Sequence, residues 1–382
     1  MTTPHPEATQ TRYRFGFVLN TTIGNMTRYL NLRKYAERDP LIQFVWAPVS
    51  HYMPQAPGKV LRLMPNGVRL RAFVLRQTAP VLREIGTLDA VMVHLFEADV
   101  LLPLRRYVRR WPVLFSSTDE APMVDRRNYP LYPNDVKKPL WRQKLRLAID
   151  MWRVRHTDYF IPFSAWAANI LKDGCDAPHS NVYPIHVGLD LEKWPEVSRS
   201  EPSDRERLKL LFVGGDFVRK GGDLLLEVYK KQFADVAELH LVSPQAPRDL
   251  LPHAYAYRDF KPNDSRLRDL YASCDLLVVP TTADTGPLWV FLEAMASGMP
   301  VIGTDTGSNI ELVRHGETGF IIPIGDGAAL AASITTLRRD PDLRRRLGQN
   351  GRALVESGYS AAINVPRILQ VMKDAVDLRR PR

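Results

Sequence analysis

The sequence predicts an α/β protein with two domains, each built on a doubly wound parallel sheet. The chain has 382 residues, which is more than a single hydrophobic core usually serves. Short apolar runs alternate with helical patterns along both halves, as in βαβ units. Around residues 190–207 this alternation stops at EKWPEVSRSEPSDRER, a charged, proline-bearing stretch typical of a linker. We therefore expect domains at residues 1–195 and 196–358, and a final segment, 359–382, whose helical period suits a helix crossing back onto the first domain.

The first domain is expected to begin with a strand, a glycine-bearing turn at TTIGN and an amphipathic helix over MTRYLNLRKYAE. Its further apolar runs are short and separated by helical patterns, which indicates buried parallel strands. The expected strands are YRFGFVLN (13–20), IQFVWAPV (42–49), DAVMVHLF (89–96), WPVLFSS (111–117) and DYFIPFS (158–164).

The second domain repeats the alternation with different residues. Its expected strands are LKLLFVGG, LHLVS, DLLVVPT, PVIGTD and GFIIPI, with helices over DLLLEVYKKQF, SRLRDLYASC and the segment around Glu293. No repeat of solenoid length is present, so the two halves share an architecture and not a sequence.

Composition narrows the classes of partner. The 45% hydrophobic and 25% charged residues are those of an ordinary globular protein. The net charge of +10 favours anionic partners such as nucleic acid, phosphate-bearing ligands or acidic lipid. Cys175 and Cys274 are far apart and lack companions at metal-ligand spacing, so both are expected to be packing residues. Without a signal peptide or a membrane span, we expect a cytoplasmic protein.

Three strand-to-helix loops of the second domain carry the chemistry expected at the carboxyl ends of parallel strands. FVGGDFVRKGG (212–222) offers glycines for close backbone approach, with Arg219 and Lys220 as cations for a phosphate. It matches neither the Walker nor the dinucleotide fingerprint, and a plain glycine turn with solvated cations stays open. TTADTGP leads into the helix of Glu293, and GTDTGSN precedes Glu311.

Glu293 is the one ionisable group in the apolar run from Leu288 to Ala296. An unpaired carboxylate is costly in such surroundings, so a partner is expected. The partner is either a core cation or hydroxyl, or a ligand that supplies hydrogen-bond donors.

These loops, in their order, resemble the donor-binding half of retaining glycosyltransferases with two Rossmann-like lobes, the GT-B fold, and specifically family 4. The motifs are FVGGDFVRKGGDLLLE, YASCDLLVVPT, VFLEAMASGMPVIGTDTGSNIELV and HGETGFIIP, preceded by SAWAANILKDGC and VYPIHVGLDLEKWP. The similarity covers residues 164–360, whereas the first 160 residues match only in architecture. It implies two Rossmann-like domains facing across a cleft.

The resemblance also implies roles. Glu293 falls on the second Glu of the E-x7-E motif, which binds the ribose hydroxyls, while the first Glu position holds Thr285 beside Asp284. Lys220 falls on the lysine that grips the diphosphate, and Arg219 substitutes for an arginine that would stand at Gly215. The residues expected to bind the donor are Gly24, Gly214, Gly215, Arg219, Lys220, Thr285, Gly286, Pro287, Leu288 and Glu293.

For catalysis the family places a His on a strand end of the first lobe, where this sequence has Thr118 and Asp119. His94, at the end of an apolar strand, is a second candidate, although such a His is often structural. The expected catalytic residues are Asp119, His94 and Asp284. The implied reaction is retaining transfer of a sugar from a nucleotide-diphosphate donor, with UDP or GDP favoured, no cofactor and no metal.

The acceptor is expected to be a glycan, a lipid-linked molecule or a small molecule. KKPLWRQKLRLAIDMWRVR (137–155) holds seven Lys or Arg against one Asp, and Trp141, Leu145, Ala148 and Trp152 share a helical face. This suits peripheral contact with the anionic inner face of a membrane, although the same face could belong to the core.

Two other functions stay open. One is a weak or inactive nucleotide- or nucleic-acid-binding protein on the same scaffold, although nucleic acid is the less favoured partner. The other is a nucleotide-sugar epimerase or hydrolase, for which Asp119, Glu120 and His94 are the visible acid and base candidates.

Overall fold

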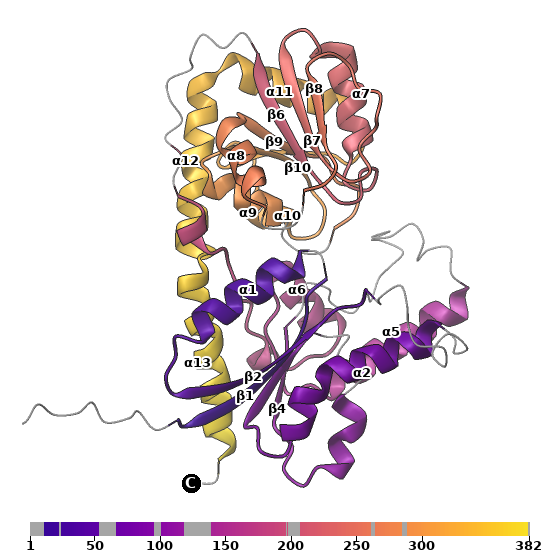
Figure 1. Ribbon diagram of the computed structural model, residues 1–382, viewed down its shortest axis with the longest axis vertical. Helices are drawn as coiled ribbons and strands as arrows, with labels where there is room; N and C mark the ends of the chain where they lie inside the picture. Colours follow the sequence, from indigo (N-terminus) through magenta and orange to yellow (C-terminus); the bar gives the residue numbers. More distant parts are fainter. Residues whose placement is uncertain are drawn as a thin grey trace, which may run out of the picture.

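The computed structural model describes residues 11–22, 24–52, 66–94, 101–117, 139–195, 197, 207–260, 264–284 and 289–380. Two parallel sheets, one in each half of the chain, are flanked by helices (Figure 1). The expected fold class is confirmed. Most of the linker expected around residues 190–207 lies outside the described residues.

The first half folds into a five-stranded sheet with the strand order β2-β1-β3-β4-β5. β1 pairs with β2 over its whole length, from Tyr13 opposite Ile42 to Asn20 opposite Val49. All strand pairs are parallel, so each connection crosses a face of the sheet. The strands are β1 (Tyr13–Asn20), β2 (Ile42–Val49), β3 (Ala90–Val93), β4 (Val113–Ser116) and β5 (Tyr159–Phe160).

Helices cover both faces of this sheet. On one face, Phe15 and Phe17 of β1 pack with Leu32 of α1. On the other, Val74 and Val81 of α2 join a separate buried cluster. The helices and short turns are α1 (Asn25–Ala36), α2 (Asn66–Glu84), η3 (Leu102–Tyr107), α5 (Leu140–Arg155), α6 (Ala165–Asn169), η4 (Ile170–Gly174), η5 (His179–Asn181) and η6 (Leu191–Lys193).

The second half forms a six-stranded parallel sheet with the order β11-β10-β9-β6-β7-β8. Its strands are β6 (Leu208–Val213), β7 (Ala237–Val242), β8 (Ala254–Tyr257), β9 (Leu276–Val279), β10 (Val301–Thr304) and β11 (Gly319–Ile322). Its helices are α7 (Gly222–Gln232), α8 (Ser265–Ser273), α9 (Trp289–Ala296), α10 (Asn309–Leu312), α11 (Gly327–Arg339) and α12 (Pro341–Gly358).

β8 is the strand that the sequence does not predict. Its residues read AYAY, and all four are half-buried or exposed. It lies at the edge of the sheet and pairs with β7. A short edge strand needs no fully buried apolar run, so the signal that identifies the other strands is missing here.

The last helix, α13 (Ala361–Arg379), returns to the first domain (Figure 1). Ile368 and Met372 of this helix lie in the same buried cluster as β1 and α1. Where the chain crosses between the domains, Leu189 and Tyr359 pair through a backbone hydrogen bond of 2.7 Å. Gly188 beside them has φ of +87°, and a Cβ there would lie 2.5 Å from the carbonyl oxygen of Tyr359. The crossing therefore requires glycine.

The carboxyl ends of the two sheets face each other. A Cβ on Gly24, which follows β1, would lie 3.3 Å from Trp289, which follows β9 in the second domain. Glu311, which follows β10, accepts hydrogen bonds from the backbone of Ala165 and Trp166, which follow β5. This is the edge at which ligands bind parallel sheets. None of the helices in the described ranges combines the length and apolarity that crossing a bilayer requires.

Candidate active site

The glycine-rich loop after β6 is held tightly against the loop after β9. Gly221 has φ of +76°, and a Cβ there would lie 2.1 Å from the carbonyl oxygen of Pro280. A Cβ on Gly214 would lie 2.9 Å from that of Lys220, whereas one on Gly215 meets nothing within 4 Å. Gly214 and Gly221 are therefore required by the fold, and Gly215 leaves open space beside the loop.

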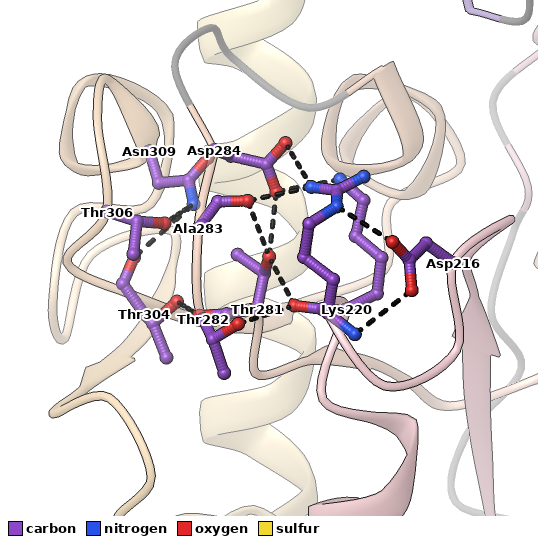
Figure 2. A network of polar contacts seen from close by, with 10 residues as sticks. Asp216, Lys220, Thr281, Thr282, Ala283, Asp284, Thr304, Thr306 and Asn309 are labelled. Atoms are coloured by element: carbon purple, nitrogen blue, oxygen red, sulfur yellow. Dashed lines mark hydrogen bonds and ion pairs between the residues drawn. The ribbon is translucent and has the colours of Figure 1, made fainter. Parts of the chain in front are cut away.

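This packing gathers Arg219, Lys220 and Asp284 into one cluster (Figure 2). The Lys220 ammonium lies 2.7 Å from the Asp284 carboxylate, and the Arg219 guanidinium lies 3.3 Å from its other oxygen. The Thr281 hydroxyl donates a further hydrogen bond of 2.8 Å to Asp284. Arg219 also donates to the carbonyl oxygen of Ala283 at 2.7 Å. Residues distant in sequence therefore form one partly buried polar site.

The charges of this cluster balance. Arg219 pairs with Asp216 at 3.2 Å as well as with Asp284, so two cations face two carboxylates. Burial lowers the pKa of the Lys220 ammonium, and the charge of Asp284 opposes that shift. The sequence assigns Asp284 to the donor sugar, but here its carboxylate lies on the cations expected to hold the diphosphate. An incoming diphosphate would compete with Asp284 for the same two partners.

Glu293 is 8% exposed and lies in α9. The Tyr271 hydroxyl of α8 donates a hydrogen bond of 2.9 Å to its carboxylate. Within the described part of the chain no cation pairs with Glu293, so the partner within the core is a hydroxyl and not a salt bridge. Of the partners expected from the sequence, Tyr271 is the core hydroxyl, and it supplies one hydrogen-bond donor. A carboxylate can accept several hydrogen bonds, so room for a ligand diol remains.

Burial sets the protonation of Glu293. Loss of solvent raises its pKa to about 7 from the usual 4.5, and the hydrogen bond from Tyr271 opposes this shift. The same burial raises the pKa of Tyr271 well above 10, so the phenol keeps its proton. Near neutral pH the carboxyl group is therefore more readily protonated than that of an exposed glutamate. A ligand that donates hydrogen bonds to it would favour the ionised form.

The loop after β10 is held by internal hydrogen bonds. Thr304 donates to the carbonyl oxygen of Thr281 at 2.6 Å, and Asn309 donates to Thr306 at 2.9 Å (Figure 2). Glu311, at the end of this loop, accepts from the backbone N–H groups of Ala165 at 3.1 Å and Trp166 at 2.8 Å. The sequence indicates the loop but not this contact between domains. Ser164, the N-cap of the helix that starts at Ala165, is a local signal for the start of that helix but not for its contact with Glu311.

The expected residues of the first domain lie on the facing edge. His94 follows β3 and is 2% exposed, with its backbone N–H bonded to Val18. Gly24 approaches the indole of Trp289, so the close contact there is made by a side chain of the second domain. The rings of His186 and Trp289 lie with their centroids 5.3 Å apart and their planes inclined by 56°. The expected site residues outside the described ranges are Asp119, Thr285, Gly286, Pro287 and Leu288.

The exposure of helix α5 contradicts one of the two positions that the sequence allows for its apolar face, at a membrane surface or in the core. Trp141 is 61% exposed and Trp152 38% exposed, so the idea that this face packs into the core is wrong. The buried face instead holds Asp150 and Arg153, which form an ion pair. The described residues contain no group of three or more His, Cys, Asp or Glu side chains placed to hold a metal ion.

Comparison with known proteins finds similarity to glycosyltransferases. Residues 195–354 match the family described as glycosyl transferases group 1. EpsD of Bacillus subtilis (strain 168), named as a glycosyltransferase, is 30% identical over 232 residues, 56% of this chain and 60% of EpsD. The D-inositol 3-phosphate glycosyltransferase of Geodermatophilus obscurus is 28% identical over 342 residues, 79% of this chain and 74% of that protein. The alignment with EpsD thus spans less than two thirds of that relative.

Solved structures share the fold. Sucrose-phosphate synthase from Thermosynechococcus elongatus has a TM-score of 0.74 at 17% identity, covering 96% of this chain and 100% of that chain. Anabaena HepE in complex with UDP-glucose has a TM-score of 0.67 at 15% identity, covering 95% of this chain and 100% of that chain. At these identities the likeness establishes the two-domain GT-B fold.

Proposed function

We propose that this chain, whose residues 195–354 match the family described as glycosyl transferases group 1, transfers a sugar from a nucleotide-diphosphate donor to an acceptor. The observation that carries the proposal is the convergence of Arg219, Lys220 and Thr281 at the carboxyl ends of β6 and β9. Two cations at an edge rich in backbone N–H groups suit a diphosphate. Glu293, in the neighbouring α9, would accept hydrogen bonds from the ribose hydroxyls.

In this scheme Lys220 and Arg219 stabilise the charge that develops on the leaving diphosphate. Asp284 gives up its contacts with both cations when the donor binds, and its carboxylate then lies free to contact the sugar. We propose that the transfer retains the configuration at the anomeric carbon, and that these cations supply the charge compensation that a metal ion supplies elsewhere. UDP and GDP are the nucleotides we favour, and HepE, a structure of the same fold, is described in complex with UDP-glucose.

The acceptor is proposed to be a glycan, a lipid-linked molecule or a small molecule, with the enzyme acting in the cytoplasm or on the inner face of a membrane. The likeness to a D-inositol 3-phosphate glycosyltransferase and to capsular polysaccharide glycosyltransferase CapM of Staphylococcus aureus supports small-molecule and glycan acceptors equally. The two domains would close over the donor and exclude water, which limits hydrolysis.

Binding and turnover test the proposal separately. Calorimetry with UDP, GDP, ADP and dTDP at fixed salt should find one diphosphate that binds wild-type protein. Glu293→Ala should weaken that binding by roughly 1–3 kcal/mol, the cost of a lost hydrogen-bond partner. Lys220→Ala should lose that binding, because Lys220 is proposed to hold the diphosphate. Its matched control is Lys231→Ala, on the exposed end of α7, which should bind normally.

Donor consumption then decides between an enzyme and a binding protein. Release of the diphosphate from its nucleotide-sugar in the presence of candidate acceptors, with the anomeric product identified by NMR, is the expected result. Binding without consumption would support the inactive nucleotide-binding alternative. If none of the four diphosphates binds, the donor site is refuted.

A further inference from the structure

The outward face of α5 carries large apolar side chains that the fold leaves in solvent. Leu140 is 74% exposed, Trp141 61%, Leu145 54% and Trp152 38%. Positions 141, 145, 148 and 152 fall on one line along a helix, so these side chains form a continuous stripe. We call Trp141, Leu145, Ala148 and Trp152 the α5 stripe. Soluble proteins rarely leave such a stripe without a function.

The same face is strongly basic. The one acidic residue of α5, Asp150, is 4% exposed and pairs with Arg153, which is 7% exposed. This ion pair lies on the buried side of the helix, whereas Arg142, Lys144 and Arg155 are exposed. The outward face of α5 therefore presents cations and apolar groups with no carboxylate among them.

The neighbouring turn η3 extends this surface. Arg105 of η3 donates a hydrogen bond of 3.4 Å to the carbonyl oxygen of His156, which places η3 beside the carboxyl end of α5. Tyr107 is 71% exposed, with the guanidinium of Arg106 4.7 Å from its ring centroid. A third amphipathic aromatic residue with a basic neighbour thus lies near the carboxyl end of α5.

We propose that the outward face of α5 binds the surface of an anionic phospholipid bilayer. Trp and Tyr side chains favour the headgroup level, and exposed Lys and Arg residues are attracted to anionic lipid. A helix with one apolar and one basic side can lie in the plane of such a surface. Leu140 and Leu145 gain from contact with acyl chains but contribute nothing to base stacking, which disfavours a single-stranded nucleic acid.

The fold determines which end of α5 lies near the carboxyl edge of the sheet. α5 joins the parallel strands β4 and β5, so it runs opposite to them and begins at the carboxyl edge of the sheet. Leu140 and Trp141 therefore lie toward the edge that faces the second domain. One consequence rests on the proposed function: a lipid-linked acceptor would reach the site from the bilayer. Membrane binding itself is independent of sugar transfer.

Sedimentation with vesicles tests the inference on the full chain without donor or acceptor. Wild-type protein should bind vesicles of equal phosphatidylglycerol and phosphatidylcholine at least tenfold more tightly than vesicles of phosphatidylcholine alone. Trp141→Ala/Leu145→Ala should weaken this binding about tenfold or more, through lost apolar contact. The matched control is Tyr255→Ala/Ile324→Ala in the second domain, which removes side chains that are 44% and 50% exposed and should bind as wild type.

Charge reversal provides an independent test of the proposed contact with anionic lipid. Each basic residue near an anionic surface contributes about fivefold in binding, so Arg142→Glu/Lys144→Glu should lose at least about 25-fold. Lys230→Glu/Lys231→Glu, at the exposed end of α7, makes the same charge change elsewhere and should lose less than a third as much. Circular dichroism and thermal melts should be unchanged for all four variants, since each replaced side chain is exposed.

Three outcomes overturn the inference. They are equal binding to neutral and anionic vesicles, equal losses in the α5 and control variants, and retention of wild-type binding by both α5 variants. If an oligonucleotide binds at the α5 stripe while anionic vesicles do not, the surface serves nucleic acid. None of these results bears on diphosphate binding at Lys220, so the proposed function is judged separately.

Discussion

Replacing Glu293 by Gln removes a charge that burial makes unfavourable, while it preserves the shape of the side chain. The carboxylate is 8% exposed and accepts a hydrogen bond of 2.9 Å from Tyr271. The amide oxygen of a Gln side chain can accept that same hydrogen bond. The difference between the two proteins therefore reports mainly the cost of ionising the buried group.

The magnitude follows from the pKa. Burial raises the pKa of Glu293 from 4.5 to about 7 in the folded protein. Between these values the folded protein keeps a proton that the unfolded chain has released, so stability falls as pH rises. The favourable contribution is fully present below pH 4.5 and is lost by the time pH has passed about 7. At roughly 1.4 kcal/mol for each pKa unit, the loss amounts to about 3 kcal/mol.

Urea unfolding followed by circular dichroism at pH 5, 6, 7 and 8 measures this loss. The stability of Glu293→Gln relative to wild type should rise with pH over this range by roughly 1.4 kcal/mol per unit and level off above pH 7. Taking the difference cancels the titration of all other groups. The matched control is Glu227→Gln, an exposed carboxylate on α7 that pairs with Lys231 and whose pKa is lowered. Its difference from wild type should be flat from pH 5 to 8.

A difference between Glu293→Gln and wild type that stays constant over this pH range would refute the reasoning. It would mean that Glu293 titrates at an ordinary pKa, either because water reaches it or because a cation pairs with it in solution. Ligand binding through an ionised Glu293 would then show no pH dependence near pH 7.

Three further predictions concern the donor site. Because an ionised Glu293 accepts hydrogen bonds from ribose, the affinity of the wild-type protein for the nucleotide-sugar should weaken by up to about tenfold for each pH unit below 7. The affinity of Glu293→Gln should not change in this way, and calorimetry can measure both. Lys220→Met should abolish diphosphate binding and destabilise the protein by about 3 kcal/mol at pH 7, since Asp284 loses a buried partner. Adding Asp284→Asn should restore the stability but not the binding. Unchanged stability of the Lys220→Met variant would contradict this prediction. Gly215→Ala should leave the melting temperature unchanged, because a Cβ there meets nothing within 4 Å, yet weaken nucleotide binding if the open space is where the ligand approaches.

The order of strands and helices was largely predictable from the sequence. Fully buried parallel strands need continuous apolar runs, and YRFGFVLN and IQFVWAPV coincide with β1 and β2 residue for residue. β8 lacks such a run because it is an edge strand, and it was missed. The need for glycine in the loop after β6 was also visible in the sequence. Gly221 is required there by its positive φ and by the closeness of Pro280.

What a charged side chain contacts was decided by the tertiary structure. The sequence showed that Glu293 needs a partner, but Tyr271 is 22 residues away and belongs to a different helix. It placed Lys220 and Asp284 in separate loops, 64 residues apart, with no indication that they pair. Helical spacing put Trp141 and Trp152 on one face of α5 but could not say whether that face is inside or outside. Periodicity and glycine preferences act within a few residues, so a sequence can reveal them, whereas ion pairs and buried faces depend on how distant segments pack together.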